Sequence, residues 1–62
     1  MKLLIDKRGN TVASLDDENR IIQGHHRIYT MRKLGLQLFI KDGDRIARAT
    51  FLDDDSVSPT VH

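Results

Sequence analysis

The sequence predicts a small α+β fold of the ββαββ type, in which one helix packs on a sheet made of two β-hairpins. Three observations indicate this class. Two short apolar runs flank a turn cluster near the start, a central stretch follows the helical period, and Asp42-Gly43 separates two alternating runs. We expect one α+β domain over residues 1–55 and a flexible C-terminal tail over residues 56–62.

The first hairpin is predicted from the runs at 2–6 and 11–15, which are joined across a Gly-Asn turn. Its register stays open at this point. A two-residue turn pairs Ile5 with Val12, whereas a three-residue turn pairs Ile5 with Thr11. The two registers place different side chains in the core.

A helix is predicted from Asn19 to Leu34 because the apolar residues of this stretch recur at helical spacing. The members of this stripe fall in one arc about 120° wide: Ile21, Ile22, His25, Ile28 and Tyr29. Gly35 follows the stretch in the position of a left-handed helix stop, with Leu36 packing back. Gly24 in the middle costs about 1 kcal/mol relative to Ala. Because of this cost, a second interpretation stays open, in which two strands, 20–23 and 26–32, turn at Gly24.

The second hairpin is predicted around Asp42-Gly43 as a type I′ turn. This turn pairs Lys41 with Asp44, Phe39 with Ile46 and Gln37 with Arg48. The core face then carries Leu36, Leu38, Ile40, Ala47, Ala49 and Phe51. The outer face carries Gln37, Phe39, Lys41, Ile46, Arg48 and Thr50.

Length and composition limit the function. The chain has 62 residues, 10 Lys and Arg against 9 Asp and Glu, and no Cys. These values exclude a multidomain enzyme and a strongly basic nucleic-acid arm. A chain this short is marginally stable alone, so we expect a homodimer. Because neither a secretory signal nor a membrane span is visible, we expect a cytoplasmic protein.

The outer face of the second hairpin is the candidate partner-binding surface. It combines an aromatic and an aliphatic side chain with basic and polar groups: Phe39, Ile46, Arg48, Gln37 and Lys41. Exposed apolar surface of this kind is usually covered by a partner. We therefore expect a non-enzymatic regulatory or inhibitory protein that docks on a protein partner. An aromatic beside basic residues also suits nucleic acid, which is the weaker interpretation of the same face.

The alternative function is weak nucleic-acid or nucleotide-phosphate binding through the helix. Arg20 and Arg27 are seven residues apart and stack on the exposed face of the predicted helix, and Lys33 lies near its end. Arginine forks match phosphate oxygens. The same residues also fit an ordinary solvated helix surface.

A third hypothesis is a small His-dependent ribonuclease. If the strand alternative holds, the run from Gly24 to Tyr29 resembles the glycine–histidine segment of HicA-type mRNA interferase toxins over six residues. The resemblance implies His25 or His26 as general acid/base, with Arg27 or Arg32 on the phosphate. In that family a helix precedes the segment, whereas here a hairpin does.

We expect no cofactor and no metal site. Adjacent helix positions diverge by about 100°, so His25 and His26 cannot chelate one ion within a helix. The run 53–55 lacks the spaced ligands and the glycine of a calcium loop. The sequence also contains no phosphate-binding glycine loop and no nucleophile elbow.

Overall fold

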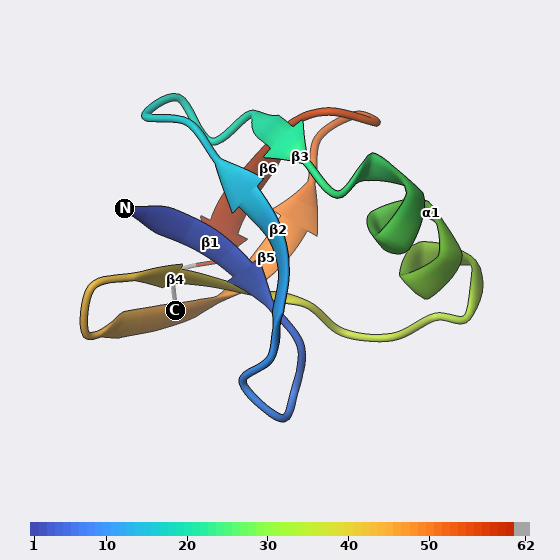
Figure 1. Ribbon diagram of the computed structural model, residues 1–62, viewed down its shortest axis with the longest axis horizontal. Coiled ribbons are helices and arrows are strands. Elements are labelled where there is room, and N and C mark those ends of the chain that lie inside the picture. Colours follow the sequence, from blue (N-terminus) through green and yellow to red (C-terminus); the bar gives the residue numbers. More distant parts are fainter. Residues whose placement is uncertain (61–62) are drawn as a thin grey trace.

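Six antiparallel strands and one helix form the fold in the computed structural model, which describes residues 1–60 (Figure 1). The elements are β1 (Lys2–Ile5), β2 (Thr11–Leu15), β3 (Ile21–Gln23), α1 (His25–Lys33), β4 (Phe39–Asp42), β5 (Arg45–Phe51) and β6 (Val57–Thr60). The strand order is β3-β2-β1-β4-β5-β6. Two three-stranded meanders therefore meet along β1 and β4. The α+β class is as predicted, but the ββαββ layout is wrong, because β3 precedes the helix and β6 ends the sheet.

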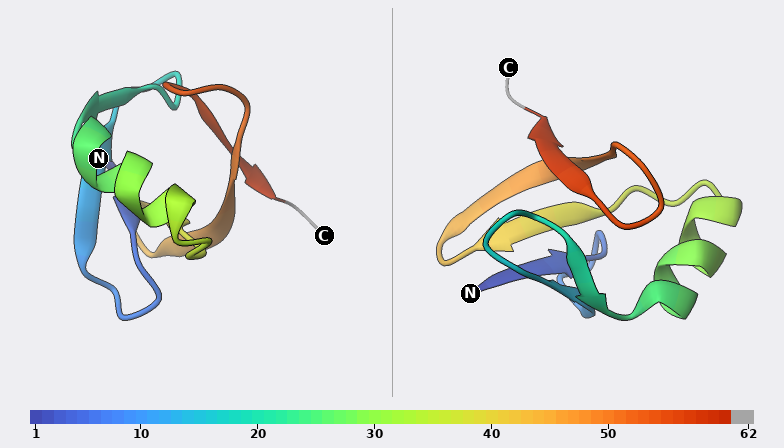
Figure 2. Two further views of the ribbon diagram at one scale, coloured as in Figure 1. Left: turned by 90° about the vertical axis from the view of Figure 1, so that its right-hand side faces the viewer. Right: turned by 90° about the horizontal axis from the view of Figure 1, so that it is seen from above.

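The sheet curls until its two outer strands approach each other at one end. Arg20 and Ser56 form an antiparallel bridge there. The backbone N–H of Ile21 donates to the carbonyl oxygen of Asp55 (2.7 Å), and that of Val57 donates to the carbonyl oxygen of Asn19 (3.0 Å). Figure 2 shows the strands around a central space, with α1 lying across one end.

The core fills this central space with aliphatic side chains from every strand and from the helix. Its buried cluster is Leu4, Val12, Ala13, Leu15, Ile21, Ile28, Leu38, Ile40, Ala49 and Val57, with Met31 and Phe51 packed against it. Leu4 and Leu38 are the most completely enclosed large side chains. Burial of these residues supplies the main stabilisation of the fold.

The first hairpin uses both registers that the sequence leaves open. Leu4 lies opposite Ala13, which is the register that a two-residue turn gives, whereas Ile5 lies opposite Thr11. A β-bulge between these pairs absorbs the extra residue. Val12 and Ala13 are consequently both buried, although they are adjacent along the strand.

The predicted register of the second hairpin is wrong by two residues. Asp42 pairs with Arg45, and Phe39 pairs with Arg48 rather than with Ile46. The loop is thus Gly43-Asp44, and Gly43 takes the positive φ (62°). Glycine at the first loop position is typical of a type II′ turn rather than type I′. A shift of two residues leaves the side chains of the paired strands on their predicted faces, because side chains alternate with period two. Leu36, predicted on the core face, precedes β4 and is 51% exposed, so its predicted position is wrong.

The single helix predicted from Asn19 to Leu34 is wrong in its first third. Residues 21–23 form β3, and the helix begins only after Gly24, which has φ 94° and ψ 19°. This left-handed conformation ends the strand and redirects the chain. Both alternatives were therefore half right, because a strand comes first and a helix follows. Ile28 is buried as predicted, but Ile22 and Tyr29 are exposed by 57% and 62%.

The end of the helix matches its prediction. Gly35 has φ 73°, its N–H donates to the carbonyl oxygen of Arg32, and the N–H of Leu36 donates to that of Met31. These two bonds define a Schellman motif. Leu36 itself remains half-exposed instead of packing back on the helix.

The predicted tail is wrong where β6 forms. Residues 57–60 pair with β5, and Val57 is only 2% exposed. The segment is a strand because β5 offers it a free edge and the core accepts the Val57 side chain. The remainder of the expected tail, 61–62, lies outside the described residues. No helix within residues 1–60 has the length and apolar character needed to cross a membrane.

Candidate binding surfaces

The outer face of β4 and β5 brings four of the predicted partner-binding residues together. Phe39 lies directly opposite Arg48, and Lys41 lies directly opposite Ile46. Side chains that face each other across antiparallel strands have Cβ atoms about 4.5–5.5 Å apart. These four side chains therefore form one continuous patch.

β1 extends this patch with two apolar residues that sequence reasoning missed. Leu3 pairs with Lys41, and Ile5 pairs with Phe39. Ile5 is only 4% exposed, so it supports Phe39 from the neighbouring strand and offers almost no contact surface of its own. We define the outer patch by these members: Leu3, Ile5, Phe39, Lys41, Ile46 and Arg48. Leu3 and Ile5 could have been identified only from the pairing of β1 with β4, which local sequence patterns do not reveal.

Exposure differs across the outer patch. Ile46 is 59% exposed, Lys41 and Arg48 are exposed, and Phe39 is half-buried. An accessible aliphatic side chain thus lies beside a supported aromatic ring and two cations. This composition is typical of a protein-binding surface, where aromatic residues and Arg are enriched.

Gln37 does not face Arg48, because the register differs by two residues from the prediction. Its side-chain amide instead donates to the carbonyl oxygens of Leu38 (2.8 Å) and Ala49 (3.4 Å). These bonds tie the start of β4 to β5. Gln37 therefore supports the edge of the outer patch.

Two acidic loops lie side by side at the end where the sheet closes. The Arg20–Ser56 bridge joins the loop after β2 to the loop after β5. Six of the nine acidic residues of the chain are in these loops: Asp16, Asp17, Glu18, Asp53, Asp54 and Asp55. The sequence shows the two acidic runs but not that they meet. The outer patch, in contrast, carries cations and no acid of its own.

The basic helix face of the phosphate-binding alternative is not formed. Arg20 lies outside the helix, and its guanidinium contacts the carboxylates of Asp16 (3.2 Å) and Glu18 (3.0 Å). Lys33 is on α1 with its ammonium 5.0 Å from the ring centre of Tyr29. Arg27 is also on α1, so the structure does not bring Arg20 and Arg27 together on a helix face.

α1 is held against the acidic loop after β5. His25 Nε2 is 3.2 Å from a carboxylate oxygen of Asp55, and Arg32 is 3.6 Å from a carboxylate oxygen of Asp54. The Arg32 guanidinium also lies 4.4 Å from the ring centre of Phe51. In the ribonuclease hypothesis Arg32 binds a phosphate, whereas here its guanidinium lies beside the carboxylate of Asp54. No group of three His, Cys, Asp or Glu side chains within residues 1–60 is placed to hold a metal ion.

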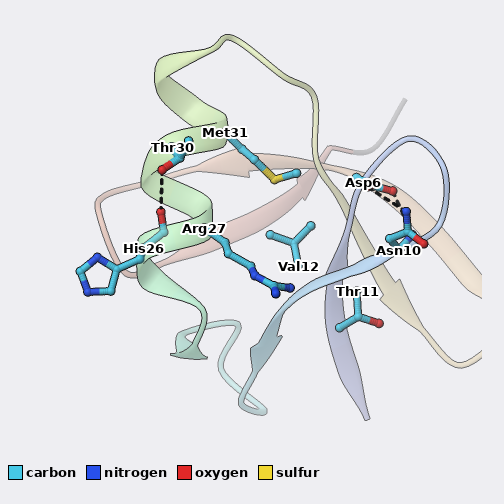
Figure 3. Close-up of a pocket in the computed structure, with 8 residues that line it drawn as sticks. All are labelled: Asp6, Asn10, Thr11, Val12, His26, Arg27, Thr30 and Met31. Carbon is cyan, nitrogen blue, oxygen red and sulfur yellow. Dashed lines mark hydrogen bonds between the residues drawn. The ribbon is translucent and has the colours of Figure 1, made fainter.

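A groove lies between α1 and the β2 edge of the sheet. Its volume is about 470 Å³, and Val12 and Met31 give it an apolar floor. Figure 3 shows the Arg27 side chain reaching from the helix toward β2, while the His26 ring points away from the groove. A second hollow of about 240 Å³ continues along β2 toward Gly24 and is also lined by Arg27.

Asp6 lines the groove, but its carboxylate is directed at the backbone of its own loop. It accepts hydrogen bonds from the N–H groups of Asn10 and Arg8, both at 2.9 Å. These bonds, the one from Asn10 most of all, hold the pKa of Asp6 below its ordinary value. Asp16 has the same arrangement with Arg20 and Glu18 in the next loop, which lowers its pKa as well.

No protein-family model, curated protein or solved structure matches this chain.

Proposed function

We propose that the chain is a cytoplasmic, non-enzymatic binding module that docks on a protein partner through the outer patch. One observation carries the proposal. The exposed side chain of Ile46 lies beside Phe39, Lys41 and Arg48 on one face of paired strands. A regulatory or inhibitory role through this docking is part of the same proposal.

The charge of the patch indicates the surface it would bind. Lys41 and Arg48 flank the apolar centre, while most acids lie on the two loops at the closing end of the sheet. A partner with an apolar depression rimmed by carboxylates would complement this arrangement. The rigid strands add little ordering cost on binding, because the patch is built on regular pairing.

The experiment compares capture by the wild-type chain with capture by two folded variants. Ile46→Asp places a charge in the centre of the outer patch. Leu52→Asp is the matched control, because Leu52 is 68% exposed and lies in the loop after β5. Proteins bound from a cell extract are quantified by mass spectrometry, and circular dichroism checks that each variant is folded.

The proposal requires a protein that wild type and Leu52→Asp retain and Ile46→Asp loses. If no bound protein distinguishes the two variants, the outer patch is not the docking surface. Sedimentation equilibrium of the wild type over a range of concentrations tests the expected homodimer separately. A dimer that Ile46→Asp dissociates would identify a second copy as the occupant.

A further inference from the structure

Two loops border a hollow beside the end of α1. Residues 6–10 form the turn between β1 and β2, and residues 34–38 connect α1 to β4. The hollow between them has a volume of about 320 Å³ and is lined by Lys7 and Arg8 from the turn and by Leu36 from the connection. In Figure 1 the turn protrudes at the bottom of the molecule and the connection at the right. The two loops therefore share one side of the molecule.

The connection after α1 presents two exposed leucines. Leu34 and Leu36 are 69% and 51% exposed, and neither belongs to the core cluster. The backbone between them is held in place, because the N–H groups of Gly35 and Leu36 donate to carbonyl oxygens near the end of α1. Neighbouring apolar side chains that are presented in this way mark an interaction site.

Three cations flank these leucines. Lys33 is in the last turn of α1, and Lys7 and Arg8 line the hollow. None of the three forms an ion pair with another residue in the described range 1–60. Asp6 also lines the hollow, but its carboxylate accepts the backbone N–H groups of Arg8 and Asn10. The side of the molecule that carries the two loops is therefore both apolar and positively charged.

We propose that this side of the molecule docks on an anionic lipid bilayer. We define the two-loop surface by these members: Lys7, Arg8, Lys33, Leu34 and Leu36. Its leucines enter the boundary between lipid headgroups and acyl chains, and its cations contact the phosphates of the headgroups. Such boundaries take up apolar side chains, and anionic leaflets attract basic residues. Two leucines and three cations form a small anchor, so the contact is peripheral and reversible.

A bilayer fits the two-loop surface better than a nucleic acid or a protein does. Single strands of nucleic acid are bound by stacking of their bases on aromatic rings, and neither 6–10 nor 34–38 contains an aromatic residue. A protein would need a pocket shaped for two protruding leucines, whereas a bilayer deforms around them. The two acidic loops lie at the top of Figure 1, on the side opposite to the β1–β2 turn, where a bilayer bound at this surface would not repel them.

The proposal is independent of the outer patch, which lies on β1, β4 and β5. A peripheral contact with a membrane leaves that patch available to a protein partner. Loss of vesicle binding would not affect the proposed docking on a protein, and loss of that docking would not affect vesicle binding.

The test is co-sedimentation of the full-length protein with vesicles. One set is phosphatidylcholine alone, and the other is phosphatidylcholine mixed with phosphatidylserine. The wild type should bind the mixed vesicles between about tenfold and a hundredfold more tightly, because each basic residue near an anionic surface contributes about fivefold. High salt should release it, because ions screen this attraction. Equal binding to the two sets, or no binding to the mixed vesicles, would overturn the proposal.

Two matched pairs of variants locate the contact. Leu34→Asp should weaken binding about tenfold, because it removes an apolar side chain from the interface and adds a charge that the lipids repel. Leu52→Asp is its control, since Leu52 is 68% exposed and lies in the acidic loop after β5. Arg8→Gln should weaken binding about fivefold. Arg45→Gln is its control, because Arg45 follows the β4–β5 turn, at the far left of Figure 1.

Both control variants should bind the mixed vesicles as the wild type does, and circular dichroism checks that all four variants are folded. Equal effects within either pair would overturn the proposal. Ile46→Asp should also bind normally, and its failure to bind would assign the contact to the outer patch instead.

Two further measurements separate a bilayer from other ligands. In small bicelles of the mixed lipids, a nitroxide on the acyl chain should broaden the amide signals of Leu34 and Leu36 more than that of Leu52. Equal broadening would mean that the leucines stay outside the bilayer, which would refute their insertion. A fluorescent single-stranded RNA is titrated as well. RNA binding that depends on Arg8, without binding to the mixed vesicles, would show that the two-loop surface is a nucleic-acid site and the bilayer proposal is wrong.

Discussion

Replacing Gly24 with Ala should destabilise the fold by about 2–5 kcal/mol. Two separate effects contribute. The residue has φ 94°, a conformation that costs an L-amino acid about 1–2 kcal/mol. The new methyl group would also lie 2.6 Å from the Val12 carbonyl oxygen and 2.9 Å from the Ala13 Cβ. Overpacking against a backbone that cannot move freely typically costs about 1–3 kcal/mol.

This loss is large for so small a chain. At roughly 0.05–0.15 kcal/mol per residue, the whole fold is stabilised by about 3–9 kcal/mol. Urea unfolding followed by circular dichroism would measure the change in the free energy of unfolding. A loss at the upper end of the expected range would leave the variant largely unfolded without denaturant if the total stability lies in the lower half of that range.

Gly9→Ala is the matched control for this experiment. Gly9 has φ 89°, yet an added Cβ there would meet no atom within 4 Å. It therefore carries the backbone strain without the clash. The entropy that Ala removes from the unfolded chain is the same for both changes and cancels in the comparison. If Gly24→Ala costs no more than Gly9→Ala, Gly24 does not approach Val12 and Ala13 as closely as the structure shows.

Three further predictions concern the closing strand and the loops. Val57→Ala should cost about 2 kcal/mol in urea unfolding, because it removes two buried carbons, whereas a change in a frayed tail would cost nothing. Asp16→Ala should lower the melting temperature, because two backbone N–H groups lose their acceptor. Asp17→Ala, at the exposed neighbouring residue, is the control, and an equal decrease in its melting temperature would refute this prediction. The pKa values of Asp6, Asp16 and Asp53 are lowered by backbone hydrogen bonds in the fold. Their stabilisation is therefore complete above the unfolded value of 3.8 and is lost as pH falls through the lower folded values. A melting temperature that stays constant from pH 5 to about pH 2 would contradict this expected loss of stability.

Local patterns predicted the parts of the fold that depend on neighbouring residues. The faces of the second hairpin follow from alternation, and the helix end follows from Gly35. The start of the helix did not follow, because Ile21 and Ile22 fit the helical period as well as they fit a strand. Only the close approach of Gly24 to Val12, which belongs to the three-dimensional structure, decides between them.

The candidate sites also contain residues that local sequence patterns predict and residues that only the three-dimensional structure brings together. Phe39, Lys41, Ile46 and Arg48 share a face because of alternation, so the sequence alone identified them. Leu3 and Ile5 join them only through the pairing of β1 with β4. The predicted basic helix face required one uninterrupted helix from Asn19 to Leu34, and it is not formed because the helix begins only at His25. The groove beside β2 exists because β3 is short, and no local pattern reports the length of a neighbouring strand.

The arrangement of the two meanders has a consequence for how the chain folds. β1, β2 and β3 pair with strands adjacent in the sequence, and so do β4, β5 and β6. Strand pairing joins the two halves at the β1–β4 pair and at the closing bridge, both of which join residues distant in the sequence. Closing a long loop costs entropy before its contacts form. We therefore expect each three-stranded meander to assemble early and the meeting of the two meanders to limit the folding rate, with the segment around α1 as the tether between them.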